Sequence, residues 1–301
     1  MDIFENRNGL EIQENSNSCV ILGDCLNILK QIKTGSVNLI FADPPYGIGK
    51  DFGVTKDDFA DISDYEKWAA LWINECMRVL SPFGTMYFMS STQYMPTLDR
   101  YVDSNYYVIN RIVWVYDSSG VQSKSKFGSL YEPILMITHN ESTKYTFNYQ
   151  DIMIEARTGA ERKLIDYRKT PPQPYSTLKV PGNVWNFNRV RYKMDEYENH
   201  PTQKPEALLE RIILASSNVG DIVLDPFSGS FTTSAVAIRL GRRAIGIEIN
   251  PDYFKIGLRR TGICSNYNGE LLFCDKSRKT KNKSKNDHLT DSSQLSLFAN
   301  T

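Results

Sequence analysis

Val37-Asn-Leu-Ile-Phe-Ala-Asp43-Pro44-Pro45-Tyr46 is the stretch on which the fold and the chemistry of this chain depend. The apolar run predicts a buried β-strand, and the carboxylate of Asp43 follows at its carboxyl end. Two prolines stiffen the next turn, because their rings fix φ, and an aromatic ring comes after them. Such a turn offers a planar amino group a carboxylate acceptor, a rigid backbone carbonyl as second acceptor, and a ring on which to stack.

The periodicity of apolar residues predicts a sheet of seven strands joined mainly by helices. Strands are predicted at 19–22, 37–42, 85–89, 108–116, 133–138, 222–224 and 244–249, and helices at 25–32, 65–80, 205–216 and 232–240. Strands that alternate with helices indicate an α/β fold with a mostly parallel sheet covered on both faces. A Gly- and Asp-rich loop is expected at 47–64, between the first catalytic candidate and the next helix.

Four acidic residues follow or end predicted strands, namely Asp24, Asp43, Asp225 and Glu248. Parallel α/β sheets bind ligands at the carboxyl ends of their strands. One acid in such a place is weak support for a site, but four of them at one edge predict a single composite site. The alternative for Asp225 and Glu248 is that they merely cap strand ends.

The segment Asp225-Pro-Phe-Ser-Gly-Ser230 indicates a cofactor without phosphate groups. Its small residues let a ligand approach the backbone, and the next helix would offer unpaired N–H groups at its start. The chain contains neither the GxGxxG of dinucleotide-binding folds nor the GxxxxGK[ST] of phosphate loops. An acid in the place of Glu248 commonly accepts from both hydroxyls of a ribose. A ribose without a pyrophosphate fits S-adenosylmethionine.

The composition is that of a soluble globular protein, since 41% of the 301 residues are hydrophobic and 23% are charged. No apolar stretch reaches the roughly 18 residues that a membrane span needs, and the N-terminus lacks a signal-peptide pattern. The five cysteines are scattered and never in CxxC spacing, which predicts reduced thiols in a cytoplasmic protein and no metal site. A net charge of zero argues against a protein that binds nucleic acid indiscriminately.

The two motifs together resemble the amino-methylating DNA methyltransferases. Asp43-Pro44-Pro45-Tyr46 precedes Asp225-Pro-Phe-Ser-Gly-Ser230, and a basic insertion lies between them, which is similar to the circularly permuted β class. His200-Pro-Thr-Gln-Lys-Pro205 is similar to the family's lead-in helix, which lines the methionine end of the cofactor. The longer stretch Tyr197-Glu-Asn-His-Pro-Thr-Gln-Lys-Pro205 looks closest to the solitary enterobacterial adenine methyltransferases of the YhdJ type. The resemblance runs from about residue 18 to 262 and implies a Rossmann-like methyltransferase fold.

The resemblance also implies a domain plan and a cofactor site. Residues 1–18 would be a loose lead-in, 19–139 the catalytic half, 140–199 a target-recognition insertion, 200–274 the cofactor-binding half and 275–301 a disordered tail. The residues implied to bind S-adenosylmethionine are Asp24, Cys25, Thr202, Lys204, Pro205, Asp225, Phe227, Ser228, Gly229, Ser230, Phe231, Glu248 and Ile249. Phe231 departs from the usual pattern, which has a glycine there, so we expect its ring to narrow the loop or to shield the methionine moiety.

The family implies how the first motif would act on adenine. The Asp43 carboxylate and the Pro44 carbonyl would each accept one N6 proton and localise the nitrogen lone pair. The turn also contains Pro45, and the ring of Tyr46 would stack on a target base flipped out of the duplex, at a cost of a few kcal/mol. A cytosine-C5 enzyme would need a Pro-Cys nucleophile, and this chain has none.

Contacts to double-stranded DNA are expected from the insertion and from a Ser- and Lys-rich loop. Between residues 156 and 193, nine Lys and Arg stand against two acids, and such an excess can follow a phosphate backbone or simply be a solvated surface. Lys124 and Lys126 could contact phosphates or only solvent. Arg189 and Arg191 would point the same way in an extended segment and could touch base edges or phosphates. Trp114 and Trp185 are expected in the core.

The function that the sequence predicts is methylation of adenine N6 in DNA. The nearest alternative is cytosine N4, for which Ser is commoner than Asp at the first motif position. A protein glutamine methyltransferase typically has Asn-Pro-Pro-Tyr and no basic insertion, and an inactive DNA-binding regulator would not need an intact first motif. The recognition site, a cognate restriction enzyme as in restriction-modification systems, and a homodimer are left open.

Overall fold

The computed structural model describes residues 1–47, 59, 61–117, 124–125, 127–156, 164–263, 266–267 and 270–271. Within these residues the main sheet has nine strands. In spatial order they are β1 (Glu11–Glu14), β2 (Ser18–Leu22), β13 (Arg243–Glu248), β12 (Ile222–Asp225), β3 (Val37–Ala42), β4 (Leu80–Met89), β6 (Tyr131–Thr138), β5 (Tyr107–Val115) and β11 (Val184–Asn186). The sheet therefore contains the seven predicted strands and one further strand at each edge.

The strand directions agree with the predicted α/β class. The neighbours from β2 through β13, β12 and β3 to β4 are all parallel, and β6 runs antiparallel between β4 and β5. In this register Asp225 pairs with Gly246, and Leu224 pairs with Ile40. The carboxyl ends of β3, β12, β13 and β2 therefore lie side by side.

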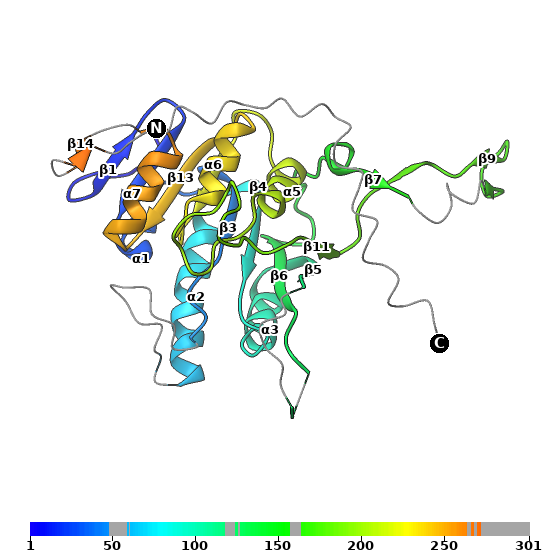
Figure 1. The fold of residues 1–301 in the computed structure, drawn as a ribbon, viewed down its shortest axis with the longest axis horizontal. Coiled ribbons are helices and arrows are strands. Elements are labelled where there is room, and N and C mark those ends of the chain that lie inside the picture. The colour runs from blue at the N-terminus through cyan, green and yellow to red at the C-terminus, as the bar shows by residue number, and fades with distance from the viewer. Residues whose placement is uncertain are drawn as a thin grey trace.

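Helices cover both faces of the sheet (Figure 1). They are α1 (Cys25–Leu29), α2 (Ile62–Val79), α3 (Met95–Asn105), α5 (Glu206–Ser216), α6 (Thr232–Arg239) and α7 (Pro251–Arg260), with a 3₁₀ turn η1 at Tyr149–Ile152. One hydrophobic layer packs α1, α2 and α3 against Ile40 and Ala42 of β3, and the other packs α5 and α6 against Leu39 and Phe41. Strand β3 is thus apolar on both faces, as its sequence predicts.

The sequence predicts a loose lead-in over residues 1–18, but in the structure this segment is ordered against the sheet. Strand β1 pairs antiparallel with β2, and the side chains of Ile3 and Phe4 are buried beside α1. The apolar side chains of this otherwise polar segment pack on the hydrophobic core beside α1.

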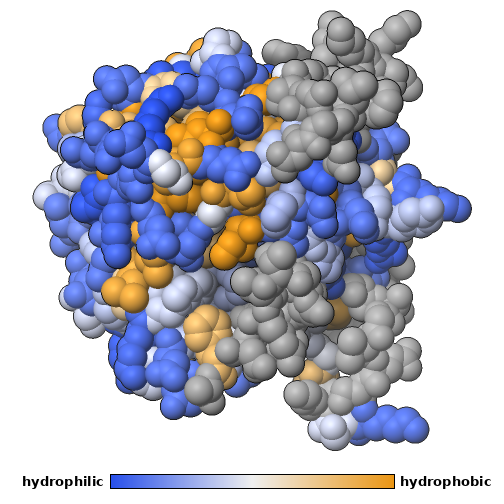
Figure 2. Space-filling model, turned by 90° about the vertical axis from the view of Figure 1, so that its left-hand side faces the viewer, coloured by the Kyte–Doolittle hydropathy of each residue, from blue (hydrophilic) through white to orange (hydrophobic). Residues whose placement is uncertain are grey.

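Figure 2 shows the side of the molecule that carries β1 and α7. Hydrophobic surface gathers near the middle of this side, and hydrophilic side chains surround it.

Two helices were not predicted, and a third begins earlier than predicted, so the loop before it is shorter. Helices α3 and α7 both begin with proline in the first turn, which favours helix initiation, yet no helix was predicted in either place. Helix α2 begins at Ile62, where the side chain of Asp61 accepts a hydrogen bond from Asp64 N, so the predicted loop 47–64 ends earlier than expected. Most of that loop and the tail 275–301 lie outside the described residues.

The insertion 140–199 adds little to the main sheet. Among its described residues only β11 joins that sheet, and there Trp185 pairs with Trp114; both side chains are buried, as predicted. The short strands β7 (Ile154–Glu155), β8 (Ile165–Asp166), β9 (Gln173–Pro174) and β10 (Leu178–Lys179) form two small ladders that extend away from the body of the protein (Figure 1). A third small ladder joins β14 (Asn266–Tyr267) and β15 (Glu270–Leu271). No described helix has the length and apolar character to cross a membrane.

Candidate active site

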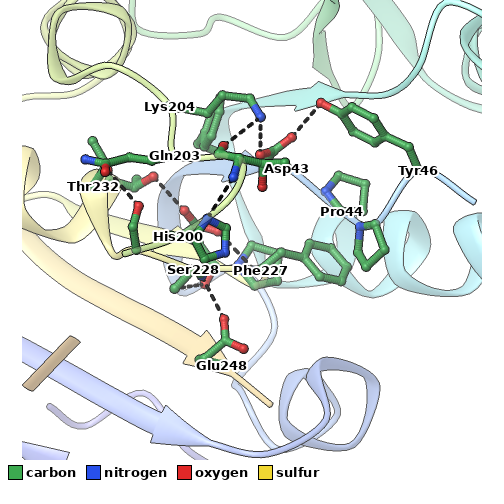
Figure 3. A pocket seen from close by; sticks show the side chains of 18 of the residues that line it. Asp43, Pro44, Tyr46, His200, Gln203, Lys204, Phe227, Ser228, Thr232 and Glu248 are labelled. Carbon is green, nitrogen blue, oxygen red and sulfur yellow. Dashed lines mark hydrogen bonds and ion pairs between the residues drawn. The ribbon is translucent and has the colours of Figure 1, made fainter. Parts of the chain in front are cut away.

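A cavity of about 530 Å³ opens at the carboxyl ends of β2, β3, β12 and β13. Its size lies in the range of small-molecule sites, and the four acids that follow or end these strands, Asp24, Asp43, Asp225 and Glu248, line it. The geometric expectation of one composite site is therefore met. Figure 3 shows the two halves of the cavity: Asp43 and Tyr46 point into one side, and Glu248 and Ser228 lie on the other.

Most of the residues singled out in the sequence meet in this cavity. The lining includes Asp24, Cys25, Asp43, Pro44, Pro45, Tyr46, Thr202, Lys204, Asp225, Phe227, Ser228, Gly229, Ser230, Glu248 and Ile249. Pro205 is buried at the start of α5 but does not line the cavity. Among the described residues, no cluster of three His, Cys, Asp or Glu side chains could hold a metal ion.

Glu248 organises the backbone on the cofactor side. Its Oε2 accepts from Gly229 N at 2.7 Å, and its Oε1 accepts from Asn250 N at 2.8 Å. Burial raises the pKa of Glu248, although the backbone N–H groups of Asn250, Gly229 and Ile249 oppose that shift. A carboxylate has about four lone-pair sites, so the side chain can still accept from the hydroxyls of a bound sugar.

Gly229 leaves no room for a side chain at the floor of the cavity. Its φ is +48°, and a Cβ there would lie 2.7 Å from His200 Nε2. The backbone of the loop therefore approaches the imidazole closely, in the way that a tight cradle for a ligand requires. His200 itself lines the cavity.

Phe231 does not face the cavity, which corrects the expectation that its ring narrows the loop or shields a ligand. The side chain is fully buried, with φ at +56°, and packs on the opposite side of the loop. A Cβ on Gly246 would lie 2.5 Å from the ring and one on Gly257 would lie 2.6 Å from it. Two glycines on β13 and α7 thus make space for the ring where the usual pattern has a glycine.

Asp225 is a buried carboxyl group with two hydrogen-bond donors. Thr233 Oγ1 donates to its Oδ2 at 2.5 Å, and Phe227 N donates to its Oδ1 at 3.0 Å. Burial raises the pKa of Asp225 to about 7, although both hydrogen bonds lower it. In the protein without ligand, this side chain therefore takes up a proton near neutral pH.

This raised pKa predicts that the ligand-free protein loses stability as the pH rises from about 4 to about 7. In that window the folded state holds a proton on Asp225 that the unfolded chain has released, and each pKa unit is worth about 1.4 kcal/mol. Asp225→Asn should flatten the pH dependence of the unfolding free energy by a few kcal/mol. Urea denaturation at pH 5, 6, 7 and 8 measures it, and parallel wild-type and variant curves would contradict the assignment.

On the catalytic side, Asp43 is bound from two directions. Tyr46 Oη donates to Asp43 Oδ1 at 2.6 Å, and Lys204 Nζ donates to Asp43 Oδ2 at 2.5 Å. Lys204 was expected to bind the cofactor, but its ammonium group pairs with the first motif instead, across 161 positions of sequence. Glu132 completes the group, since its Oε2 lies 3.1 Å from Tyr46 Oη and 3.6 Å from Lys204 Nζ.

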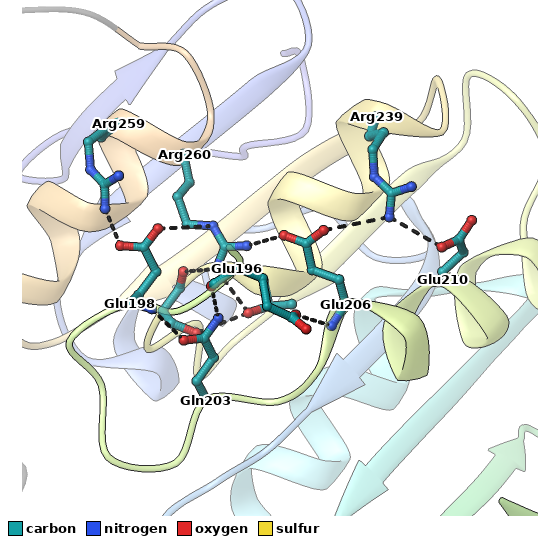
Figure 4. Close-up of polar contacts among 10 residues, drawn as sticks. Glu196, Glu198, Gln203, Glu206, Glu210, Arg239, Arg259 and Arg260 are labelled. Atoms are coloured by element: carbon teal, nitrogen blue, oxygen red, sulfur yellow. Dashed lines mark hydrogen bonds and ion pairs between the residues drawn. The ribbon is translucent and has the colours of Figure 1, made fainter. Parts of the chain in front are cut away.

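A polar network holds the segment that delivers Lys204 (Figure 4). Gln203 donates to Glu196 O at 2.5 Å and accepts from Glu198 N at 2.7 Å. Glu198 in turn pairs with Arg259 and, at 3.9 Å, with Arg260 of α7. These contacts tie the loop before α5 to the end of α7, which fixes the path of the chain beside the cavity.

The candidate DNA contacts lie in different surroundings. Arg189 lines the cavity, and its guanidinium carbon lies 4.9 Å from the ring centre of Tyr116. Arg191 is exposed, and its Nη2 donates to Asp117 O at 3.0 Å. The two arginines are not in a strand, so the alternation argument does not apply. Lys124 is exposed, and Lys126 lies outside the described residues.

Tyr116 and Glu132 are cavity residues that sequence reasoning missed. Tyr116 follows β5 directly, and the strand-end rule could have found it. Glu132 lies near the amino end of β6, which reaches the same edge because β6 is antiparallel to its neighbours. A prediction of strand direction as well as strand position would have placed it there.

The family model for DNA methylases matches residues 37–259, which span both halves of the cavity. The chain therefore belongs to the DNA methylase family, as the two motifs and their order had predicted. A relative from Escherichia coli (strain K12), the DNA adenine methyltransferase YhdJ, is 58% identical over 92% of this chain and 94% of its own length. The predicted resemblance to the YhdJ type is confirmed.

Solved structures share the fold. The cytosine-N4-specific PvuII DNA methyltransferase aligns with a TM-score of 0.62 at 18% identity, over 82% of this chain and 86% of its own. The M1.HpyAVI–SAM complex aligns with a TM-score of 0.52 at 23% identity, over 80% of this chain and 97% of its own. At this level of identity the likeness confirms the Rossmann-like methyltransferase fold.

Proposed function

We propose that this protein transfers a methyl group from S-adenosylmethionine to adenine N6 in double-stranded DNA, at one sequence context and on a base flipped out of the duplex. The observation that carries the proposal is that Asp43, Pro44 and Tyr46 share one cavity with Gly229 and Glu248. The name and 58% identity of the Escherichia coli relative support adenine rather than cytosine as the target.

The residues on the cofactor side fit S-adenosylmethionine. Glu248 has free acceptor capacity beside the loop at Gly229, whose backbone has no side chain in the way. Asp24 and Cys25, which follow β2 on the same edge, would contact the adenine ring of the cofactor. Thr202 and His200 also line the cavity, and His200 lies against Gly229. When bound, the cofactor supplies a methyl group already activated by a sulfonium.

The catalytic residues have little covalent chemistry to perform. The Asp43 carboxylate and the Pro44 carbonyl would each accept one proton of the amino group and so localise its lone pair. The work of the protein is then positioning and electrostatics. The ring of Tyr46, held through its hydroxyl by Asp43 and Glu132, would stack on the base and offset part of the cost of flipping.

The insertion 140–199 would read the DNA sequence, with Arg189 and Arg191 as its candidate contacts and Lys124 as a contact from the loop before β6. Its two small ladders extend away from the body of the protein (Figure 1), and Arg189 lines the cavity, which supports this use. The proposed reaction takes place where the DNA is, in the cytoplasm.

Modification-sensitive sequencing of DNA from cells that express the protein tests this function. The expected result is N6-methyladenine at one short sequence context, absent from cells that lack the gene. Methylation at cytosine N4 would overturn the adenine assignment, and unmodified DNA would overturn the function itself. In the same experiment Arg191→Ala should relax one position of the context if Arg191 touches a base edge, and should lower methylation uniformly if it touches a phosphate.

A further inference from the structure

The hydroxyl of Tyr46 faces two carboxylates but has only one proton to donate. Its oxygen lies 2.6 Å from Asp43 Oδ1 and 3.1 Å from Glu132 Oε2. Burial raises the pKa of Tyr46 well above its ordinary value, and the two carboxylates raise it further. The phenol therefore keeps its proton, and rotation of the hydroxyl about the Cζ–Oη bond moves that proton from one carboxylate to the other.

Lys204 holds the other side of the same group. Its Nζ lies 2.5 Å from Asp43 Oδ2, 3.3 Å from Thr202 O and 3.6 Å from Glu132 Oε2, and its side chain is 8% exposed. Burial lowers the pKa of Lys204, but the carboxylates of Asp43 and Glu132 outweigh it and leave a net rise. The cluster thus contains two carboxylates and one ammonium, with the phenol proton as its movable part.

In this arrangement both oxygens of Asp43 already accept a hydrogen bond from the protein. A phenol proton at such a short distance reduces the charge that Oδ1 can offer to an incoming amino group. If the proton turns to Glu132, the hydroxyl keeps a charged acceptor and Oδ1 regains its negative charge. The ring of Tyr46 does not need to move, so it can stack on the base in either state.

We propose that Glu132 is a positioning residue that accepts the Tyr46 proton and so releases Asp43 Oδ1 for the target amino group. No covalent bond forms or breaks in this step, since one hydrogen bond from Tyr46 is exchanged for another. The inference rests on the proposed function, because it assigns Glu132 a part in presenting Asp43 to the base.

A simpler role for Glu132 is to balance the charge of Lys204, and a double-mutant cycle separates the two. Charge balance does not depend on the phenol, whereas proton exchange does. The variants are Glu132→Gln, Tyr46→Phe, which keeps the ring but has no proton to exchange, and the two combined. Duplexes with the sequence found by sequencing are the substrate, and single-turnover methylation at saturating cofactor is measured.

The expected result is that Glu132→Gln slows methyl transfer at least about tenfold in the wild-type background, which is about 1.4 kcal/mol of barrier. In the Tyr46→Phe background the same change should slow it less than about twofold. Cofactor affinity should stay within error in all variants, and melting curves show whether each variant is folded at the assay temperature. Equal slowing in both backgrounds, or no slowing in either, would overturn the inference, whereas an inactive wild type would refute the proposed function instead.

A binding measurement gives a second readout that needs no turnover. With S-adenosylhomocysteine bound, wild type should prefer a duplex with adenine at the target over one with purine, which lacks the amino group. Glu132→Gln should lose most of that preference, and adding Tyr46→Phe should restore it. If Glu132→Gln does not fold, Glu132→Asp takes its place in the same cycle. A preference that the Glu132 change leaves intact would also sink the proposal.

Discussion

Asp43→Asn is expected to slow methyl transfer by about 10²–10³-fold or more while S-adenosylmethionine still binds with nearly unchanged affinity. The amide oxygen is neutral and the amide nitrogen carries protons, so the side chain can no longer draw on the target N6 proton as a charged acceptor. Loss of one such group costs this much in well-studied active sites. Asparagine also removes the negative charge that lies 2.5 Å from Lys204 Nζ, which disturbs the position of the side chain further. Single-turnover methylation and calorimetric cofactor binding measure the two effects.

Asp2→Asn is the matched control for this substitution. The Asp2 side chain is 93% exposed and pairs with Lys33 far from the cavity, so its loss should change neither rate nor affinity. Thermal melting of Asp43→Asn should separate a catalytic loss from a folding loss, since Glu132 remains within 3.6 Å of Lys204 to balance its charge. An Asp43→Asn variant that methylates DNA at the wild-type rate would remove Asp43 from the mechanism.

The sequence alone predicts which edge of the sheet carries the candidate site. Asp43, Asp225 and Glu248 follow or end short apolar runs, and the strand–helix rhythm makes these runs parallel strands. Parallel strands put their carboxyl ends at one edge, so the acids had to converge, and they do. This step needs only local patterns and a general rule about connections.

Contacts between segments that are distant in the chain could not be predicted from the sequence. Lys204 was placed with the cofactor because it follows a motif with that role, but its ammonium group reaches Asp43, which depends on the path of the loop before α5. The sequence around Glu132 does not distinguish it from a solvent-exposed residue at the end of a strand. Only the antiparallel direction of β6 places it at the edge of the sheet that carries the cavity. Phe231 fits only because Gly246 and Gly257, on two other elements, both lack a Cβ.

The structure of the N-terminal segment could not be predicted from its composition either. Its polar composition predicted a loose chain, yet β1 pairs with β2 and the side chains of Ile3 and Phe4 are buried. Average composition describes whether a segment can form a core of its own, and this one cannot. Composition does not predict whether apolar side chains such as Ile3 and Phe4 pack on a core that other parts of the chain form.

Glu248→Ala is expected to weaken cofactor binding by about 2–4 kcal/mol, or roughly 30- to 1000-fold in Kd. The sequence alone suggested a loss confined to the ribose hydroxyls. The structure adds a second cost, because the carboxylate also accepts from Gly229 N, which is partly buried, and from Asn250 N, which is buried, and alanine leaves both donors without this acceptor. Glu5→Ala, at an exposed position, is the control and should bind normally.

An analogue of S-adenosylhomocysteine without the 2′ and 3′ hydroxyls separates the two costs. Against this ligand Glu248→Ala should lose only the part that comes from the loosened loop at Gly229, so its effect on Kd should be smaller than with the natural ribose. If the loss is the same for both ligands, Glu248 acts on the loop alone and does not contact the sugar. If alanine changes neither affinity, the carboxylate lies outside the cofactor site, and the loop at Gly229 keeps its shape through φ = +48° and the close packing on His200 instead.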